Sequence, residues 1–234
     1  MQIADRGAGR ALLLDALGTI VSLQPPAPVL RTELATRFGF EISEPEAQQA
    51  LAAEIAYYRA HLDQGRDPAS LAALRGSCAE VLRAALPGSE RLARIDGHSL
   101  TEALLASLRF APFPDAAAAI RAAKARGERV IVVSNWDISL PDVLARVGLA
   151  PLLDGIVTSA GAGARKPDSA IFERALAIAG TGAQHATHVG DNLAEDVAGA
   201  RAAGITPILV NRTPPTRGTA PAGVRSIASL AELP

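Results

Sequence analysis

The chain has 234 residues, of which 49% are hydrophobic and 20% are charged, and its formal net charge is −1. This length suffices for one large domain or a core with an insertion, and the balanced charge argues against a basic, nucleic-acid-binding surface. The single cysteine, Cys78, excludes an internal disulfide, and no apolar stretch approaches the roughly 20 residues that span a membrane. We therefore expect a cytoplasmic protein that binds neither nucleic acid nor a membrane.

The first predicted element is an apolar run, Ala11 to Leu14, which ends at Asp15 and is followed by the turn-forming pair Gly18-Thr19. The run predicts a buried strand. Asp15 then lies where a parallel sheet ends, which is where ligands bind in α/β proteins. An ionised carboxylate in apolar surroundings needs a metal, a cation or several donors. The sequence should therefore contain partners for Asp15.

Residues 21–112 read as helices without a clear strand, in the ranges 29–38, 45–62, 69–86 and 100–108. Cys78 lies in the third range, where we expect it to pack among apolar residues rather than act as a nucleophile. The triplet Pro112-Phe113-Pro114 marks a stiff return of the chain. We therefore predict a helical insertion over 21–112 in a core that comprises 1–20 and 113–234.

From about residue 113 onward, short apolar runs alternate with Ala-rich helical patterns. The predicted strands are 130–133, 156–157, 187–189 and 207–210, and the predicted helices are 114–126, 140–147, 169–179 and 194–203. Glycines that favour a left-handed helix end follow these helices at Gly127, Gly148, Gly180 and Gly204. The alternation predicts a doubly wound parallel sheet of the α/β class, with strands buried on both faces. A polar, Pro-rich loop over 214–223 precedes a short terminal element.

Polar residues follow three of the later runs. Ser134 and Asn135 come directly after 130–133, where they could bind an anion or cap a helix. Lys166 precedes a proline after a glycine-rich loop, and by itself it is typical of a solvated loop lysine. Asp191 and Asp196 flank the turn after 187–189. Asp196 is explained by the first turn of a helix, whereas Asp191 is not.

Carboxylates grouped at one sheet edge repel one another unless a cation joins them, and hard oxygen ligands select Mg²⁺. With Mg²⁺ held by Asp15 and Asp191, one carboxylate could attack a phosphoryl group that Lys166 and Ser134 hold. This is the chemistry of phosphoryl transfer through an aspartyl-phosphate.

These segments, in this order, resemble the motifs of the haloacid dehalogenase-like hydrolase superfamily, most closely the subfamily with a helical cap inserted after the first motif. They are Asp15 to Thr19, Val133 to Asn135, Lys166-Pro167, and Gly190-Asp191 through Asp196. The resemblance covers the whole core of about 140 residues. It implies a Rossmann-like core and makes the insertion 21–112 a cap.

The resemblance also implies residue roles. Asp15 is then the nucleophile, and Lys166 offsets charge on it and on the intermediate. Ser134 and the backbone amide of Asn135 bind the transferred group. The metal ligands are Asp15, the carbonyl of Leu17, Asp191 and, through water, Asp196, which could instead pair with Lys166.

Leu17 departs from the phosphatase pattern of this superfamily. Phosphatases usually carry a second aspartate at this position, which protonates the leaving alcohol and activates water. Leucine cannot transfer a proton, and general acid–base catalysis is typically worth about 10²- to 10⁴-fold in rate. Dehalogenases also lack this aspartate because a halide leaves without a proton. Asp191 argues against a dehalogenase, because without a metal it would repel an anionic haloacid.

Three functions therefore remain at this point. The first is a Mg²⁺-dependent phosphatase of a small phosphorylated metabolite, slowed by Leu17. The second is a dehalogenase of a small halogenated acid, and the third is a non-catalytic protein that binds Mg²⁺ and phosphate. We expect a monomer or homodimer. The substrate stays open, as does the role of the helical segment that carries Tyr57, Tyr58, Arg59 and His61.

Overall fold

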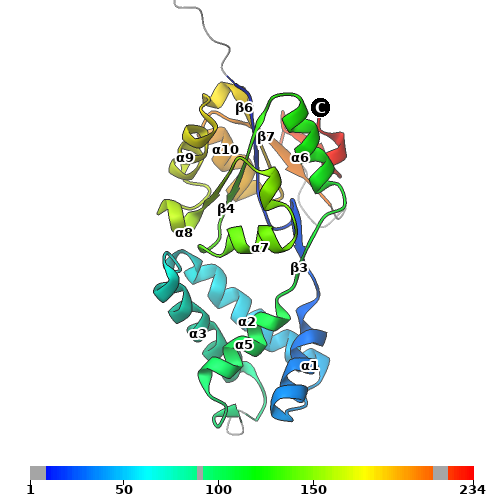
Figure 1. Ribbon diagram of the computed structural model, residues 1–234, viewed down its shortest axis with the longest axis vertical. Helices are drawn as coiled ribbons and strands as arrows, with labels where there is room; N and C mark the ends of the chain where they lie inside the picture. Colours follow the sequence, from blue (N-terminus) through cyan, green and yellow to red (C-terminus); the bar gives the residue numbers. More distant parts are fainter. Residues whose placement is uncertain (1–8, 89–91, 213–220) are drawn as a thin grey trace, which may run out of the picture. The chain divides into compact units, whose positions relative to one another are not determined.

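The computed structural model describes residues 9–88, 92–212 and 221–234, and the chain divides into two compact units. One unit comprises Met1–Ser22 and Pro112–Pro234, and we call it the core unit. The other, Leu23–Ala111, is the helical unit (Figure 1). The predicted loop 214–223 lies mostly outside the described residues.

The core unit contains a six-stranded sheet in which every neighbouring pair is parallel. The spatial order is β5 (Gly155–Thr158), β4 (Arg129–Ser134), β1 (Ala11–Leu14), β6 (Ala186–Gly190), β7 (Thr206–Val210) and β8 (Arg225–Ile227). Leu14 at the end of β1 pairs with Val132 of β4 and with Val189 of β6. Residues that follow these three strands therefore lie at one edge of the sheet, and the predicted α/β fold class is confirmed.

Helices cover both sides of this sheet. They are α6 (Ala116–Ala125), α7 (Leu140–Arg146), α8 (Ser159–Ala162), α9 (Ser169–Ala179) and α10 (Ala198–Ala202). Figure 1 shows α9 and α10 on one side of the strands and α6 on the other. Val130 to Val133 are fully buried, as the continuous apolar run predicted. The glycines predicted at helix ends all have positive φ, including Gly180 at the end of α9.

The predicted helix over 194–203 differs in its first turn. A π-helical turn, Leu193–Val197, precedes α10. The carbonyl of Asn192 accepts from the amides of both Asp196 and Val197, and the Asn192 side chain accepts from Ala194 and Glu195. This wide turn carries Asp196 to the inside of the fold, where it is 1% exposed. Such turns occur frequently at functional sites.

The helical unit consists of α1 (Pro26–Phe38), α2 (Glu44–His61), α3 (Pro68–Ala85) and α5 (Gly97–Ser107) among its described residues. Capping boxes at Ser43 and Asp67 fix the starts of α2 and α3. A hydrophobic cluster joins the helices through leucines such as Leu34, Leu82 and Leu104. Cys78 is buried in this cluster, which confirms its predicted packing role.

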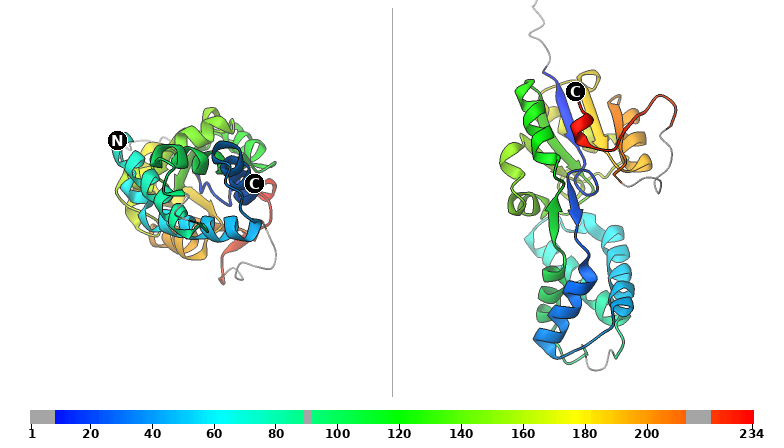
Figure 2. Two further views of the ribbon diagram at one scale, coloured as in Figure 1. Left: turned by 90° about the horizontal axis from the view of Figure 1, so that it is seen from below. Right: turned by 90° about the vertical axis from the view of Figure 1, so that its right-hand side faces the viewer.

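Two short strands, β2 (Val21–Leu23) and β3 (Phe110–Pro112), pair where the chain leaves and re-enters the core unit (Figure 2). The prediction of no strand over 21–112 is wrong at these two places. Three residues are too few to produce the alternation that identifies a strand. Along the described parts of the chain, no helix combines the length and the apolar character needed to cross a bilayer.

A partly buried ion pair ties four segments of the core unit together. Asp115 precedes α6 and accepts two hydrogen bonds of 2.9 Å from the guanidinium of Arg212, which follows β7. The same carboxylate accepts from Ser229 Oγ at 2.6 Å and from the amide of Leu230 at 2.8 Å. Arg212 also donates to the carbonyl of Thr19 in the turn after β1. Asp115 therefore anchors both the turn after β1 and the C-terminal segment.

Replacing Asp115 with asparagine should lower the free energy of unfolding by about 1–3 kcal/mol at pH 7, because charged hydrogen bonds are lost. Burial acts to raise the pKa of Asp115, but hydrogen bonds from Arg212, Ser229 and Leu230 outweigh it and hold the pKa below its ordinary value. A depressed pKa contributes stability above the unfolded-state value of about 3.9, and this is lost as the pH falls through the folded value.

Urea unfolding of the wild-type and Asp115→Asn proteins at pH 7 and pH 3 measures this difference. The difference in the free energy of unfolding between the two proteins should be smaller at pH 3 than at pH 7. An equal difference in the free energy of unfolding at both pH values would contradict a stabilising role for the ionised Asp115 carboxylate. Asp142→Asn, at an exposed position of α7, is the matched control and should change stability by less than about 0.5 kcal/mol.

Candidate active site

Asp15 follows β1 at the centre of the sheet and is only 6% exposed. Its amide donates to the carbonyl of Val189, which continues the pairing of β1 with β6. Its Oδ1 accepts from Ser134 Oγ at 2.9 Å and from Lys166 Nζ at 2.7 Å. Burial raises the pKa of Asp15, and the contacts with Lys166 and Ser134 offset this only in part. A cation beside Asp15 would therefore favour its ionised form.

Lys166 is buried between two carboxylates, so the solvated alternative is wrong. The residue is 2% exposed, and its Nζ lies 2.7 Å from Asp15 Oδ1 and 2.5 Å from Asp196 Oδ1. Burial acts to lower the pKa of Lys166, but the charges of Asp15 and Asp196 outweigh it and raise the pKa above its ordinary value. Lys166 is thus a fixed positive charge beside Asp15.

Asn135 holds the backbone of Lys166 in place. Its Oδ1 accepts from the Lys166 amide at 2.7 Å, and its Nδ2 donates to the Lys166 carbonyl at 3.0 Å. Two hydrogen bonds from one side chain fix both the position and the direction of this backbone. The motif predicts ligand binding by the Asn135 backbone amide only, and no local sequence signal reveals the contact of its side chain with Lys166.

Asp196 completes the row of charges on the far side of Lys166. Its Oδ1 also lies 2.9 Å from Nε2 of His188, and its Oδ2 accepts from the Asn192 amide at 2.9 Å. Burial acts to raise the pKa of Asp196, but Lys166 and His188 outweigh it and lower the pKa well below its ordinary range. Of the two contacts predicted for Asp196, the one with Lys166 is observed.

His188 lies on β6 beneath this row and is fully buried. Its ring meets Phe172 edge-on, with the ring centroids 5.0 Å apart. Because a carboxylate only accepts hydrogen bonds, Nε2 carries the proton that is donated to Asp196. No local sequence signal reveals the contact of His188 with Asp196.

Two glycines allow the acidic side chains to approach the site. A Cβ at Gly18, where φ is +82°, would lie 2.1 Å from Oδ2 of Asp191. A Cβ at Gly190 would lie 2.1 Å from Cγ of Asp196. Any other residue at either position would therefore displace a carboxylate. Both glycines stand in the quoted motifs, yet only the structure shows what each one makes room for.

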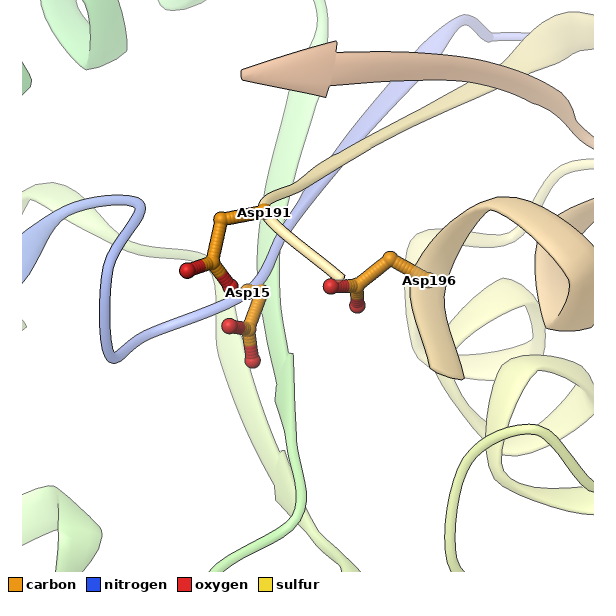
Figure 3. Close-up of side chains that lie close together, drawn as sticks. All are labelled: Asp15, Asp191 and Asp196. Carbon is orange, nitrogen blue, oxygen red and sulfur yellow. The ribbon is translucent and has the colours of Figure 1, made fainter. Parts of the chain in front are cut away.

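One carboxylate oxygen each from Asp15, Asp191 and Asp196 lie within 4.8 Å of one another. Figure 3 shows the three carboxylates close together at the ends of their segments. When all three are ionised, the cluster holds two negative charges more than Lys166 neutralises. The donor atoms are hard oxygens, and Asp191 is only half-buried, so a small divalent cation fits both the charge and the chemistry.

The structure brings together most of the residues predicted for the site. Asp15, Ser134, Lys166 and Asp196 form one hydrogen-bonded group, and Asp191 joins it through the carboxylate cluster. Leu17 lies half-buried in the turn between Asp15 and Gly18.

The segment with Tyr57, Tyr58, Arg59 and His61 lies on α2 of the helical unit. The rings of Tyr57 and His61 stack there with centroids 4.0 Å apart. Tyr57 and Tyr58 pack against the hydrophobic cluster of that unit.

Comparison with known proteins places this geometry in a family. The pattern of the haloacid dehalogenase-like hydrolases matches residues 10–204. Haloacid dehalogenase-like hydrolase domain-containing protein 3 of Bos taurus is 42% identical over 95 residues, which cover 41% of this chain and 38% of that protein. Glyceraldehyde 3-phosphate phosphatase of Methanothermobacter thermautotrophicus is 36% identical over 121 residues, or 51% of each chain.

Solved structures are similar to this chain over nearly its whole length. The defluorinating L-2-haloacid dehalogenase Rha0230 superposes with a TM-score of 0.70 at 24% identity, covering 96% of this chain and 93% of that one. At this identity the likeness shows the shared fold. The sequence relatives match over about half of their length or less. The family pattern spans most of this chain, which therefore belongs to the haloacid dehalogenase-like hydrolases.

Proposed function

We propose that this protein is a Mg²⁺-dependent phosphatase of a small phosphorylated molecule, acting through an aspartyl-phosphate on Asp15. The observation that carries the proposal is the buried Lys166, which is held by Asp15 on one side and Asp196 on the other. A fixed cation beside a carboxylate at a strand end suits a nucleophile that attacks an anionic group. The partial sequence match to a glyceraldehyde 3-phosphate phosphatase supports phosphoryl chemistry.

In this proposal Asp15 attacks the phosphorus atom and carries the phosphoryl group. Lys166 offsets the charge that gathers on Asp15 and on the transferred group. The Ser134 hydroxyl, which lies 2.9 Å from Asp15 Oδ1, turns to bind a phosphoryl oxygen together with the Asn135 amide. Water then hydrolyses the aspartyl-phosphate and regenerates Asp15.

The carboxylates of Asp15 and Asp191, with the main-chain carbonyl of Leu17, are the proposed metal ligands. Bound Mg²⁺ would neutralise phosphoryl oxygens and align them for attack. Asp196 already accepts hydrogen bonds from Lys166, His188 and Asn192. Its proposed role is to hold Lys166, and any contact with the metal runs through water.

The helical unit is the proposed cap that excludes water and selects the substrate. Its segment with Tyr57, Tyr58, Arg59 and His61 supplies the candidate specificity residues. We propose that the protein is cytoplasmic and is a monomer or homodimer.

A second candidate, hydrolysis of a carbon–halogen bond, is favoured by Leu17. Its aliphatic side chain suits a halide, which departs without a proton. The carboxylate of Asp191 opposes this candidate, because it adds negative charge where an anionic haloacid would bind. The two activities differ in their need for a metal.

Replacing Asp15 with asparagine should lower Mg²⁺-dependent hydrolysis of 4-nitrophenyl phosphate by at least about 10³-fold, because the amide cannot form the covalent intermediate. Phosphate release with and without Mg²⁺ measures the effect. The exposed Asp142→Asn variant is the control and should match the wild type. Halide release from a 2-haloacid without metal, lost in Asp15→Asn, would instead support the second candidate.

Mg²⁺ alone should stabilise the protein against heat, because it binds the folded site. At 100 times its Kd a ligand contributes about 2.7 kcal/mol, which corresponds to a Tm increase of about 5–10 °C for a chain of this length. Asp191→Asn should remove most of this increase, and Asp142→Asn should keep it. Thermal melts with and without Mg²⁺ measure both. An undiminished increase in Asp191→Asn would refute the assignment of Asp191 as a ligand.

A further inference from the structure

Cleavage of a phosphate ester at Asp15 produces a leaving group that carries an electron pair. A bond forms between a carboxylate oxygen of Asp15 and phosphorus, the bond from phosphorus to the leaving oxygen breaks, and its electron pair stays on that oxygen. A simple alkoxide is about as basic as hydroxide, whose conjugate acid water has a pKa of about 15.7, so it must be protonated as it departs. A carboxylate, whose conjugate acid has a pKa of about 4, departs without a proton.

The side-chain donors nearest Asp15 in the core unit bond to carboxylates. The Ser134 hydroxyl donates to Asp15 Oδ1 at 2.9 Å. The ammonium of Lys166 is held between Asp15 and Asp196, and its side chain is 1% exposed. His188 is fully buried behind Asp196, with Nε2 bonded to that carboxylate. Ser134 and Lys166 thus donate to Asp15, and Lys166 and His188 to Asp196, and the proposed role of Ser134 and Lys166 is to bind the transferred group.

Leu17 occupies the turn immediately after Asp15. It is half-buried, and its side chain is a hydrocarbon with no proton to transfer. Ala16, between the two, is fully buried and equally inert. The segment that follows the nucleophile therefore supplies no acid, and within the described core unit neither do the groups that contact Asp15.

We infer that the substrates are phosphoryl compounds whose leaving group is a stable anion, in particular acyl phosphates, rather than phosphate esters of simple alcohols. This inference rests on the proposed function and names the substrate class of the same site. The leaving carboxylate of an acyl phosphate keeps its electron pair and needs no donor. The absence of a proton donor at Leu17 then lowers the rate of the first chemical step only slightly.

The second step balances with water alone. The oxygen of water bonds to the phosphorus of the aspartyl-phosphate, and the bond from phosphorus to Asp15 breaks with its electron pair returning to the carboxylate. The proton that water loses passes to a phosphate oxygen or to solvent. Ser134 and Lys166, which donate hydrogen bonds to Asp15, are not bases that accept this proton, so we expect the second step to be the slower one for acyl phosphates.

The leaving-group dependence of the Mg²⁺-loaded wild-type enzyme tests the inference. The probes are aryl phosphates whose phenols differ in acidity, with acetyl phosphate at one extreme and glycerol phosphate at the other. The parameter is kcat/KM, because it reports the step that breaks the first bond. It should fall by about 10²-fold or more toward the poorest leaving groups, the amount that general acid catalysis usually supplies. A flat profile would overturn the inference.

Two variants at one position provide the matched comparison. Leu17→Asp introduces a carboxyl group that can donate a proton, whereas Leu17→Asn has the same size and cannot. The aspartate variant should narrow the spread in kcat/KM by about 10²-fold, chiefly by improving glycerol phosphate, and the asparagine variant should not. An equal effect of both substitutions would count against the inference. If either variant fails to fold, the wild-type profile decides the question.

The outcomes separate this inference from the proposed function. Turnover that Asp15→Asn abolishes, with a flat leaving-group profile, would overturn the substrate class alone. The absence of turnover with every phosphoryl probe, acetyl phosphate included, would overturn both. A burst of one equivalent of leaving group with acetyl or 4-nitrophenyl phosphate, followed by a slower steady rate, would support the slow second step.

Discussion

The structure of the site depends on one interaction, the burial of the Lys166 ammonium between the carboxylates of Asp15 and Asp196. A charge in the interior is tolerated only when opposite charges and hydrogen bonds surround it. Each member of this row therefore requires the next, and His188 and Asn192 satisfy the remaining acceptors of Asp196. The result is a positive charge at a fixed place beside a carboxylate at the end of the central strand.

The parallel sheet makes this arrangement possible with short elements. Because β1 lies between β4 and β6, the residues after three strands meet without long side chains. The turns are also specialised: Gly18 and Gly190 leave space for Asp191 and Asp196, and the π-helical turn carries Asp196 inward. The sheet thus determines where the site lies, and the two glycines and the π-helical turn determine how closely its side chains approach one another.

The sequence was sufficient to predict the strands β1, β4, β5, β6 and β7, the family and the cluster of polar residues, because each depends on local patterns. Val130 to Val133 form a continuous apolar run, and Asp15, Ser134 and Asp191 each stand at the end of such a run. The contacts of Asn135 with Lys166 and of His188 with Asp196 could not be predicted, because they join segments that meet only after folding. The π-helical turn was missed because its residues favour an ordinary helix equally well.

The two hydrogen bonds between the Asn135 side chain and the backbone of Lys166 affect which parts of this sequence can change during evolution. Lys166 is held by Asn135, which directly follows β4 and lies 31 residues earlier in the chain. Loops anchored at both ends tolerate changes in length at small entropic cost. The stretch between α8 and Lys166 should therefore tolerate insertions and substitutions during evolution. A designed segment inserted there would leave the ammonium of Lys166 in its place beside Asp15.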